Sequence, residues 1–154
     1  MKKYLPGILL VIGVVGLIIY IVSGYTIKFE RKDYQTIAYN QKFEKYVDGE
    51  INGLDLSTVI NMAVENNLNY EIKVDEDGYY VPDNKNSTKI FIYLSGSEEE
   101  FAMEDFIEVG LEDFNNAYSD AKFECTDIQY HKKTGRVSQM IFVQSEESER
   151  NSAN

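Results

Sequence analysis

An uncharged apolar run near the start of the chain constrains the fold more than any other feature. From Leu5 to Val22 there are eighteen residues without a charged side chain. A helix that crosses the hydrocarbon core of a bilayer needs about 20 mainly apolar residues. Tyr4 and Tyr25 flank the run, where aromatic side chains anchor a helix at the membrane interface. The sequence therefore predicts an N-terminal transmembrane anchor, residues 1–24, that enters the membrane through residues 5–22.

A cleaved signal peptide is the alternative interpretation of the same run. Val22 and Gly24 are small enough to precede a cleavage site. The run is longer than the ~7–15 apolar residues of a signal-peptide core, however, and no Ala-x-Ala follows it. An uncleaved signal anchor is the favoured interpretation.

Charges on the two sides of the run bear on its orientation. Lys2 and Lys3 precede it, and Lys28, Arg31 and Lys32 follow it, so the positive-inside count is nearly balanced. A very short basic N-terminus before a single span is typical of an export signal. We expect a single-pass protein of the cell membrane with an extracytoplasmic soluble domain. The inverted topology, a cytoplasm-facing regulator, stays open.

The rest of the chain is acidic and contains a single cysteine. Residues 34–154 carry ten Lys and Arg against 24 Asp and Glu, a net charge of -14. Such a surface repels the phosphates of nucleic acids and of anionic lipids, so we expect a protein partner and no nucleic acid. One cysteine excludes an intramolecular disulfide and a zinc site built from several thiolates.

Hydrophobic periodicity predicts a small α+β domain after the anchor. The predicted helices cover residues 34–47, 54–67 and 103–118, the last beginning after a capping box at Ser97–Glu100. The predicted strands cover residues 70–74, 79–81, 89–94, 122–131 and 137–143. Strand 89–94 is the most apolar and is expected to be central. Short turns between strands favour an antiparallel sheet with about three helices packed on one face.

These elements set the domain organisation. A juxtamembrane linker, residues 25–33, follows the anchor. The acidic α+β domain covers residues 34–145. The polar tail, residues 146–154, is expected to be disordered.

Cys125 and His131 are the only cysteine and the only histidine, which invites comparison with a catalytic pair. Six residues of continuous strand separate the two by about 20 Å, whereas a nucleophile and its base need hydrogen-bond contact. We therefore expect Cys125 to be a small buried hydrophobic residue. His131, at the mouth of a turn, is expected to be solvated or hydrogen-bonded.

Two acidic stretches are candidate cation sites. The turn Asp75–Gly78 resembles part of a calcium loop, but Lys73 and Asn84 occupy the ligand positions 1 and 12, so a solvated turn is favoured. An acidic face is expected at the start of the third helix, where carboxylates favour the helix dipole and a weak cation site is the alternative. Its members are Glu98, Glu99, Glu100, Glu104, Asp105 and Glu108.

No motif selects a nucleophile, a phosphate-binding loop or a metal-binding helix. The sequence thus predicts no catalytic, cofactor-binding or metal residue, and no cofactor. The twelve tyrosines suit either a contact surface or a small core that lacks tryptophan. The favoured function is a non-enzymatic interaction or assembly module at the cell envelope. The alternative is an envelope hydrolase that uses paired carboxylates.

Three stretches carry a resemblance to known proteins. They read YNQKFEKYVDGEINGLDLSTVINMAVENN, FAMEDFIEVGLEDF and FECTDIQYHKKTGRVSQMIF, within residues 35–143. This pattern resembles uncharacterised small single-span membrane proteins of low-GC Gram-positive bacteria. The resemblance implies a bacterial membrane setting and no activity.

A second resemblance is architectural. An apolar N-terminal helix followed by an amphipathic helix and an antiparallel sheet is similar to type IV pilins and pseudopilins. Prepilins place their processing glycine before the apolar run and a glutamate within it. Here residues 5–22 contain no glutamate, and the similar segment GYTIKFE, residues 24–30, follows the run.

Overall fold

The structure is a computed structural model that describes residues 15–21 and 34–145. The chain divides into two compact units, Met1–Ile37 and Ala38–Asn154. Residues 15–21 are helical, and none of the described helices is both long and apolar enough to cross a bilayer. Most of the predicted anchor, all of the linker 25–33 and the tail 146–154 lie outside the described residues.

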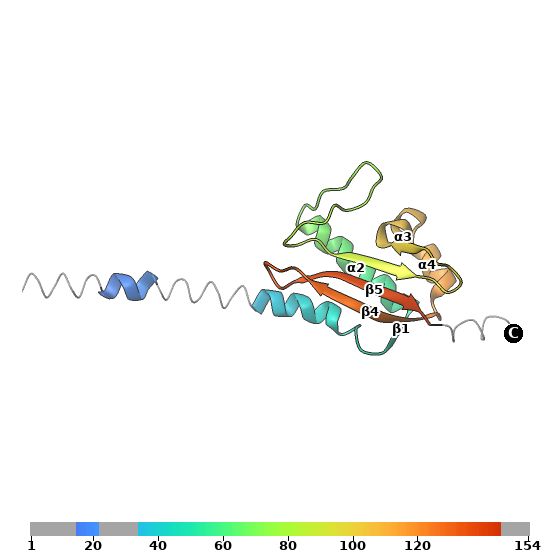
Figure 1. Cartoon of the computed structure of the whole chain (residues 1–154), viewed down its shortest axis with the longest axis horizontal. Coiled ribbons are helices and arrows are strands. Elements are labelled where there is room, and N and C mark those ends of the chain that lie inside the picture. The colour runs from blue at the N-terminus through green and yellow to red at the C-terminus, as the bar shows by residue number, and fades with distance from the viewer. Residues whose placement is uncertain (1–14, 22–33, 146–154) are drawn as a thin grey trace, which may run out of the picture. The chain divides into compact units, whose positions relative to one another are not determined.

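The domain has the predicted α+β class. Residues 34–44 are helical, as expected from their apolar spacing. The elements that follow are β1 Glu50–Asn52, α2 Gly53–Asn69, β2 Lys89–Tyr93, β3 Glu100–Ala102, α3 Met103–Val109, α4 Leu111–Tyr118, β4 Lys122–Tyr130 and β5 Val137–Gln144. Figure 1 shows α3 and α4 side by side at one end of the sheet, with the β4–β5 turn at the other end.

The five strands form one sheet in the order β1-β4-β5-β2-β3. β2 pairs in parallel with β5, whereas the other three pairs are antiparallel. The predicted antiparallel sheet was therefore wrong, and the sheet is mixed. Strand β3, two helices and β4 separate β2 from β5 along the chain, which is long enough for the crossover that a parallel pair requires. β2 is an interior strand as expected, but β5 occupies the middle position.

The predicted strands 70–74 and 79–81 are absent from the sheet. Only an isolated bridge joins Val74 to Tyr80. Helix α2 runs past its expected end to Asn69, and Glu71 then adopts a left-handed backbone with φ 51°. The alternating side chains of this segment stay largely exposed, so no buried face holds an extended strand in place.

The expected capping box at Ser97–Glu100 does not begin a helix. The Ser97 hydroxyl accepts a hydrogen bond from the Glu99 backbone N–H, and Glu100 opens the edge strand β3. Helix α3 begins at Met103, where the Asp105 carboxylate accepts from the Ala102 backbone N–H at 2.7 Å. The capping carboxylate therefore lies five residues beyond the expected glutamate.

The core lies between the sheet and the helices that pack on it. Its fully buried large side chains come from the first helix, from α2, from the start of α3 and from three strands. They include Phe43, Leu56, Val59, Ile60, Ile90, Ile92, Met103, Phe123, Val137, Met140 and Phe142. Apolar burial of this kind supplies most of the driving force for folding. It also holds α3 against β2 and β3, and α4 against α2.

Candidate functional site

Cys125 and His131 bind different parts of the domain. The Cys125 thiol is half-buried against the core, where burial raises its pKa, and it donates to the Asp127 carbonyl at 3.4 Å. The His131 ring is buried, and its Nε2 donates to the Ser87 carbonyl at 2.7 Å. A bulge between Cys125 and Asp127 also interrupts the strand register. Of the two expected roles for His131, the structure shows the hydrogen-bonded one.

Arg136 joins three segments at the β4–β5 turn. Its guanidinium lies 3.7 Å from the centre of the Tyr39 ring and 4.7 Å from that of Tyr70. It donates to the Tyr70 hydroxyl at 3.0 Å and to the Asn66 side-chain oxygen at 2.9 Å. Stacking on two rings and a planar set of donors are properties specific to arginine. These contacts join the turn to the first helix and to the end of α2.

The carboxylate of Glu104 belongs to a buried ion pair. Its Oε1 lies 2.7 Å from Lys89 Nζ, and both side chains are less than one-tenth exposed. The same oxygen accepts from the Tyr80 backbone N–H at 3.0 Å, while Oε2 is buried without a hydrogen-bond partner. Lys89 also donates to the Tyr80 carbonyl at 3.2 Å. Glu104 therefore holds the loop before β2 against α3.

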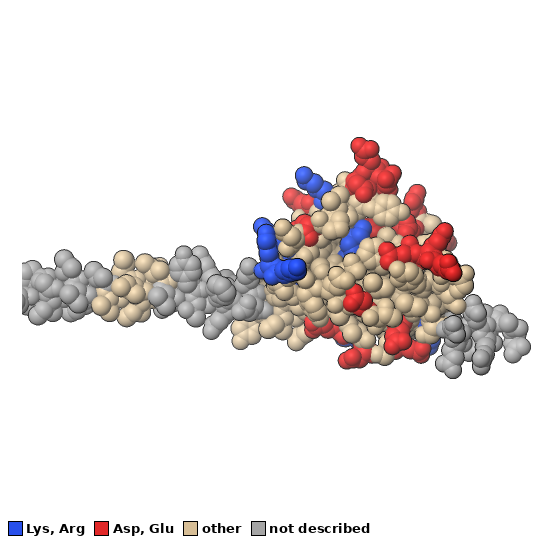
Figure 2. Space-filling view, viewed as in Figure 1, with Lys and Arg blue, Asp and Glu red and all other residues tan. Residues whose placement is uncertain are grey.

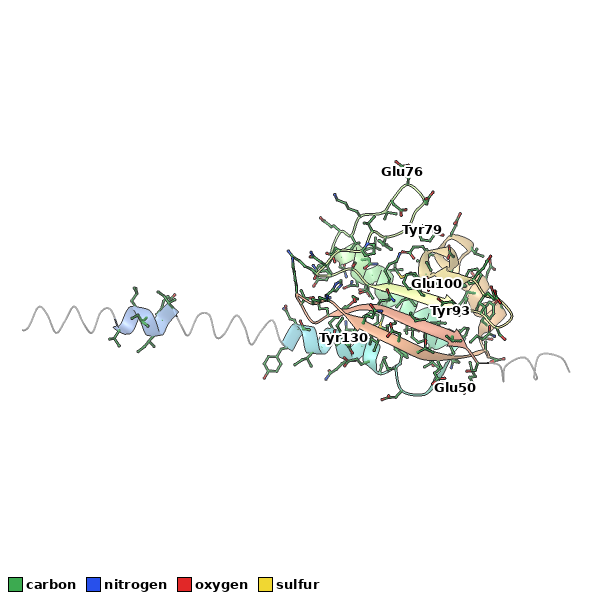
Figure 3. All side chains as sticks on the ribbon, viewed as in Figure 1. Glu50, Glu76, Tyr79, Tyr93, Glu100 and Tyr130 are labelled. Atoms are coloured by element: carbon green, nitrogen blue, oxygen red, sulfur yellow. The ribbon has the colours of Figure 1, made fainter. Side chains whose placement is uncertain are left out.

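The other acids of this region bind tyrosines or backbone groups one by one. Tyr79 donates to Asp105, and Tyr93 donates to Glu100 at 2.5 Å across neighbouring strands. Figure 3 shows the side chains of Tyr93 and Glu100 at the same end of the sheet. In the calcium-loop candidate, Asp75 accepts from its own turn's backbone at 2.9 and 3.1 Å. Across residues 15–21 and 34–145, no three His, Cys, Asp or Glu side chains are grouped as a metal site would require.

Carboxylates raise the pKa of the tyrosines that donate to them. The hydrogen bond to Asp105 and the charge of that carboxylate raise the pKa of Tyr79 to about 12. Burial and the hydrogen bond to Glu44, at 2.9 Å, raise the pKa of Tyr130 to about 12. These hydroxyls stay protonated near neutral pH and act as hydrogen-bond donors between elements.

An apolar groove of about 350 Å³ lies along β3, α3 and α4. The residues that line it are Phe101, Asp105, Phe106, Val109, Gly110, Asp113, Phe114, Ala117 and Tyr118. Its aromatic rings form a continuous series, with centroids 5.9, 4.9 and 5.1 Å apart from Phe101 through Phe106 and Phe114 to Tyr118. The surface of the groove is almost wholly apolar.

A glycine creates this groove by breaking one expected helix into two. The sequence predicts a single helix through residues 103–118, but Gly110 has φ 105° and ends α3. An L side chain rarely adopts this conformation, so the break is specific to glycine. Helix α4 then presents lining residues at spacings of three, four, seven and eight after Gly110. Phe114 is buried beneath them, and Val109 is 69% exposed at the edge.

The groove lies in the most one-sided charge environment of the domain. Residues 95–121 contain nine Asp and Glu and no Lys or Arg. Figure 2 shows acidic side chains on the side that carries α3 and also at the top and along the lower edge of the domain, and most visible basic side chains toward the opposite end. Asp113 is an exposed member of the lining. The groove is therefore apolar at its centre and acidic around it.

The aromatic residues Phe106, Phe114 and Tyr118 fall at helical spacing within the predicted helix 103–118, which by itself predicts no groove. The signal for a groove was Gly110 in the middle of the periodic segment, followed by acids at Glu112 and Asp113. Glycine ends helices, and acids favour the first turn of the next one. Together, these two signals predict that the residues before Gly110 and the residues after it belong to separate helices that share one face.

Comparison with known proteins gives no relative. No protein family matches the chain, and no curated protein and no solved structure has a significant similarity to it.

Proposed function

We propose that this chain is a membrane-anchored, non-enzymatic interaction module that binds a protein partner in the groove between α3 and α4. The acidic domain is presented on the outer face of the bacterial cytoplasmic membrane. The groove is the single observation that carries this proposal. Its volume of about 350 Å³ lies within the range of ligand sites, and its lining is nearly all apolar.

The chemistry of the groove supports binding over catalysis. A hydrolase of the predicted alternative type needs two carboxylates facing one substrate bond. Here Glu104 and Asp105 are neighbours in sequence but bind separate partners, Lys89 and Tyr79. The lining contains two acids, Asp105 and Asp113. Because Asp105 is already hydrogen-bonded to Tyr79, Asp113 has no second carboxylate beside it to form a catalytic pair.

The membrane part of the proposal rests on the sequence. The uncharged run Leu5–Val22 has the length of a span, and the domain and tail together carry a net charge of -14, which anionic lipids repel. Tethering to a membrane raises the effective concentration of the domain near a partner in the same membrane. A weak individual contact then suffices for assembly.

Site-specific photocrosslinking in intact membranes tests the proposal. A photoreactive phenylalanine analogue replaces Val109, which is 69% exposed beside the groove, or Leu54, which is 51% exposed on α2. We expect an adduct of one defined size from Val109 and none from Leu54. The additional substitution Ala117→Trp, which fills the groove, should remove the adduct. Equal labelling from both positions would contradict the proposal.

A further inference from the structure

We infer that the occupant of the groove is a cationic amphipathic helix of a partner protein. This inference rests on the proposed function and specifies its partner. It follows from the charge around the groove and from the nearly apolar surface of its lining.

The negative charge around the groove favours a basic occupant. The nine acids of residues 95–121 have no Lys or Arg among them. In the part of the chain that the structure describes, the only salt bridge joins Glu104 to Lys89. Glu108, Glu112 and Asp113 are all exposed on α3 and α4. A partner with Lys or Arg beside its apolar residues would neutralise these carboxylates and associate faster.

The lining favours a helix over an extended peptide. An extended segment leaves its backbone N–H and C=O groups to be paired by the receptor. The groove offers almost no polar surface for that purpose. A helix satisfies its backbone internally and presents apolar side chains three and four residues apart. Phe101, Phe106 and Tyr118 supply the aromatic surface against which such side chains pack.

A second copy of the chain is a poorer occupant. The domain and tail together carry a net charge of -14, so two copies repel each other. Nucleic acid and anionic lipid are repelled for the same reason. Charge complementarity therefore points to a basic segment of a different protein.

Binding of designed peptides to the full chain in zwitterionic nanodiscs tests the inference. Each probe is an amphipathic peptide of about 16 residues, or roughly four helical turns. All have the same leucine face, and the flanking positions are Lys, Gln or Glu. Fluorescence anisotropy should give at least about tenfold tighter binding for the Lys peptide than for the Gln peptide. The Glu peptide should not bind. Raising the salt concentration from about 0.05 to 0.5 M should remove most of the difference, because salt screens exposed charges.

Two variants locate the site. Asp113→Asn should weaken binding of the Lys peptide about threefold or more and leave the Gln peptide unchanged. Asp48→Asn, an exposed acid outside residues 95–121 and outside the lining, is the matched control and should change neither. Ala117→Trp should abolish binding of both peptides. Circular dichroism confirms that each variant is folded. If Ala117→Trp does not fold, the effect of Asp113→Asn on binding of the Lys peptide decides whether the groove is the site.

The outcomes separate this inference from the proposed function. Equal affinity for the Lys and Gln peptides, lost in Ala117→Trp, would overturn the basic partner and keep the groove as a docking site. The inference is also wrong if the Lys peptide binds Ala117→Trp as tightly as the unchanged protein. Sedimentation that shows a dimer dissociated by Ala117→Trp would assign the groove to a second copy. A crosslink from Val109 without any Lys-peptide binding would leave only the proposed function standing.

Discussion

At the residue scale, the Lys89–Glu104 pair is the most consequential contact of the domain. Both side chains are buried, so each charge has lost most of its hydration. Such a pair adds little net stability, but an unpaired buried charge is costly. Lys89 lies at the start of β2 and Glu104 in the first turn of α3, so the pair fixes the α3 side of the groove to the sheet.

A double-mutant cycle measures this dependence. Lys89→Met alone should lower the free energy of unfolding by about 3–5 kcal/mol, because Glu104 is left charged and buried. The double variant Lys89→Met with Glu104→Gln should be clearly more stable than that, since glutamine still accepts from Tyr80. Urea unfolding of the full chain in mild detergent gives the energies. Additive losses would show that the two side chains do not interact.

The tyrosine–carboxylate hydrogen bonds give stability a dependence on high pH. The pKa values of Tyr79 and Tyr130 are raised to about 12 in the folded chain, from an ordinary value of 10.0. In the unfolded chain, the pKa of a tyrosine is near about 10. The folded state therefore holds these protons more tightly. Their stabilising effect is complete below about pH 10 and is lost as the pH rises toward about 12.

The unfolding midpoint should decrease as the pH is raised from 9 to 12. In the double variant Tyr79→Phe with Tyr130→Phe the decline should be shallower, because neither hydroxyl can then titrate. Each single variant should lie between the two. A decline of unchanged slope in the double variant would assign the alkaline effect to other groups.

At the element scale, the packing of α2 against α4 depends on a glycine. A Cβ added to Gly53 would lie 2.0 Å from the Tyr118 carbonyl oxygen, far inside contact distance. The first turn of α2 therefore touches the backbone at the end of α4. This approach positions Tyr118 and Phe114 beneath the groove, with ring centroids 5.1 Å apart.

Gly53→Ala should destabilise the domain by about 1–3 kcal/mol, the usual cost of forcing extra volume into a packed site. Thr58→Ala, an exposed position of the same helix, is the control and should stay within about 0.5 kcal/mol. Urea unfolding compares the two variants. A neutral Gly53→Ala would mean that the ends of the two helices move apart without cost.

At the scale of the whole molecule, we propose that a membrane anchor in residues 1–24 carries the binding domain. The orientation of this proposed anchor would decide which proteins the groove meets. The charge on the two sides of the apolar run is nearly balanced, so it does not decide between export of the domain and the inverted topology. An extracytoplasmic groove would meet the basic segments of other envelope proteins.

Thiol labelling in intact cells tests the orientation. A Ser152→Cys substitution in a Cys125→Ala background places one reporter in the polar tail. A membrane-impermeant maleimide should label it before the cells are lysed. Labelling only after lysis would place the domain in the cytoplasm and favour the regulator alternative.

Local patterns in the sequence determined the α+β class, most of α2, strand β2 and the β4–β5 hairpin. Each has several residues of one period, so the buried face shows in the sequence itself. The three-residue strands β1 and β3 were missed because a strand so short has no period to detect.

Only the tertiary structure decided which strand β2 pairs with, because its partner β5 returns from more than 40 residues away along the chain. The groove was decided in the same way. Gly110 is visible in the sequence, but its positive φ and the contact of Gly53 with Tyr118 arise when α2, α3 and α4 pack together. The sequence determined that these residues are apolar, whereas packing decided that Phe114 is buried and that Val109 is left open beside a groove. Burial depends on neighbours distant in sequence, and periodicity within a single helix carries no information about them.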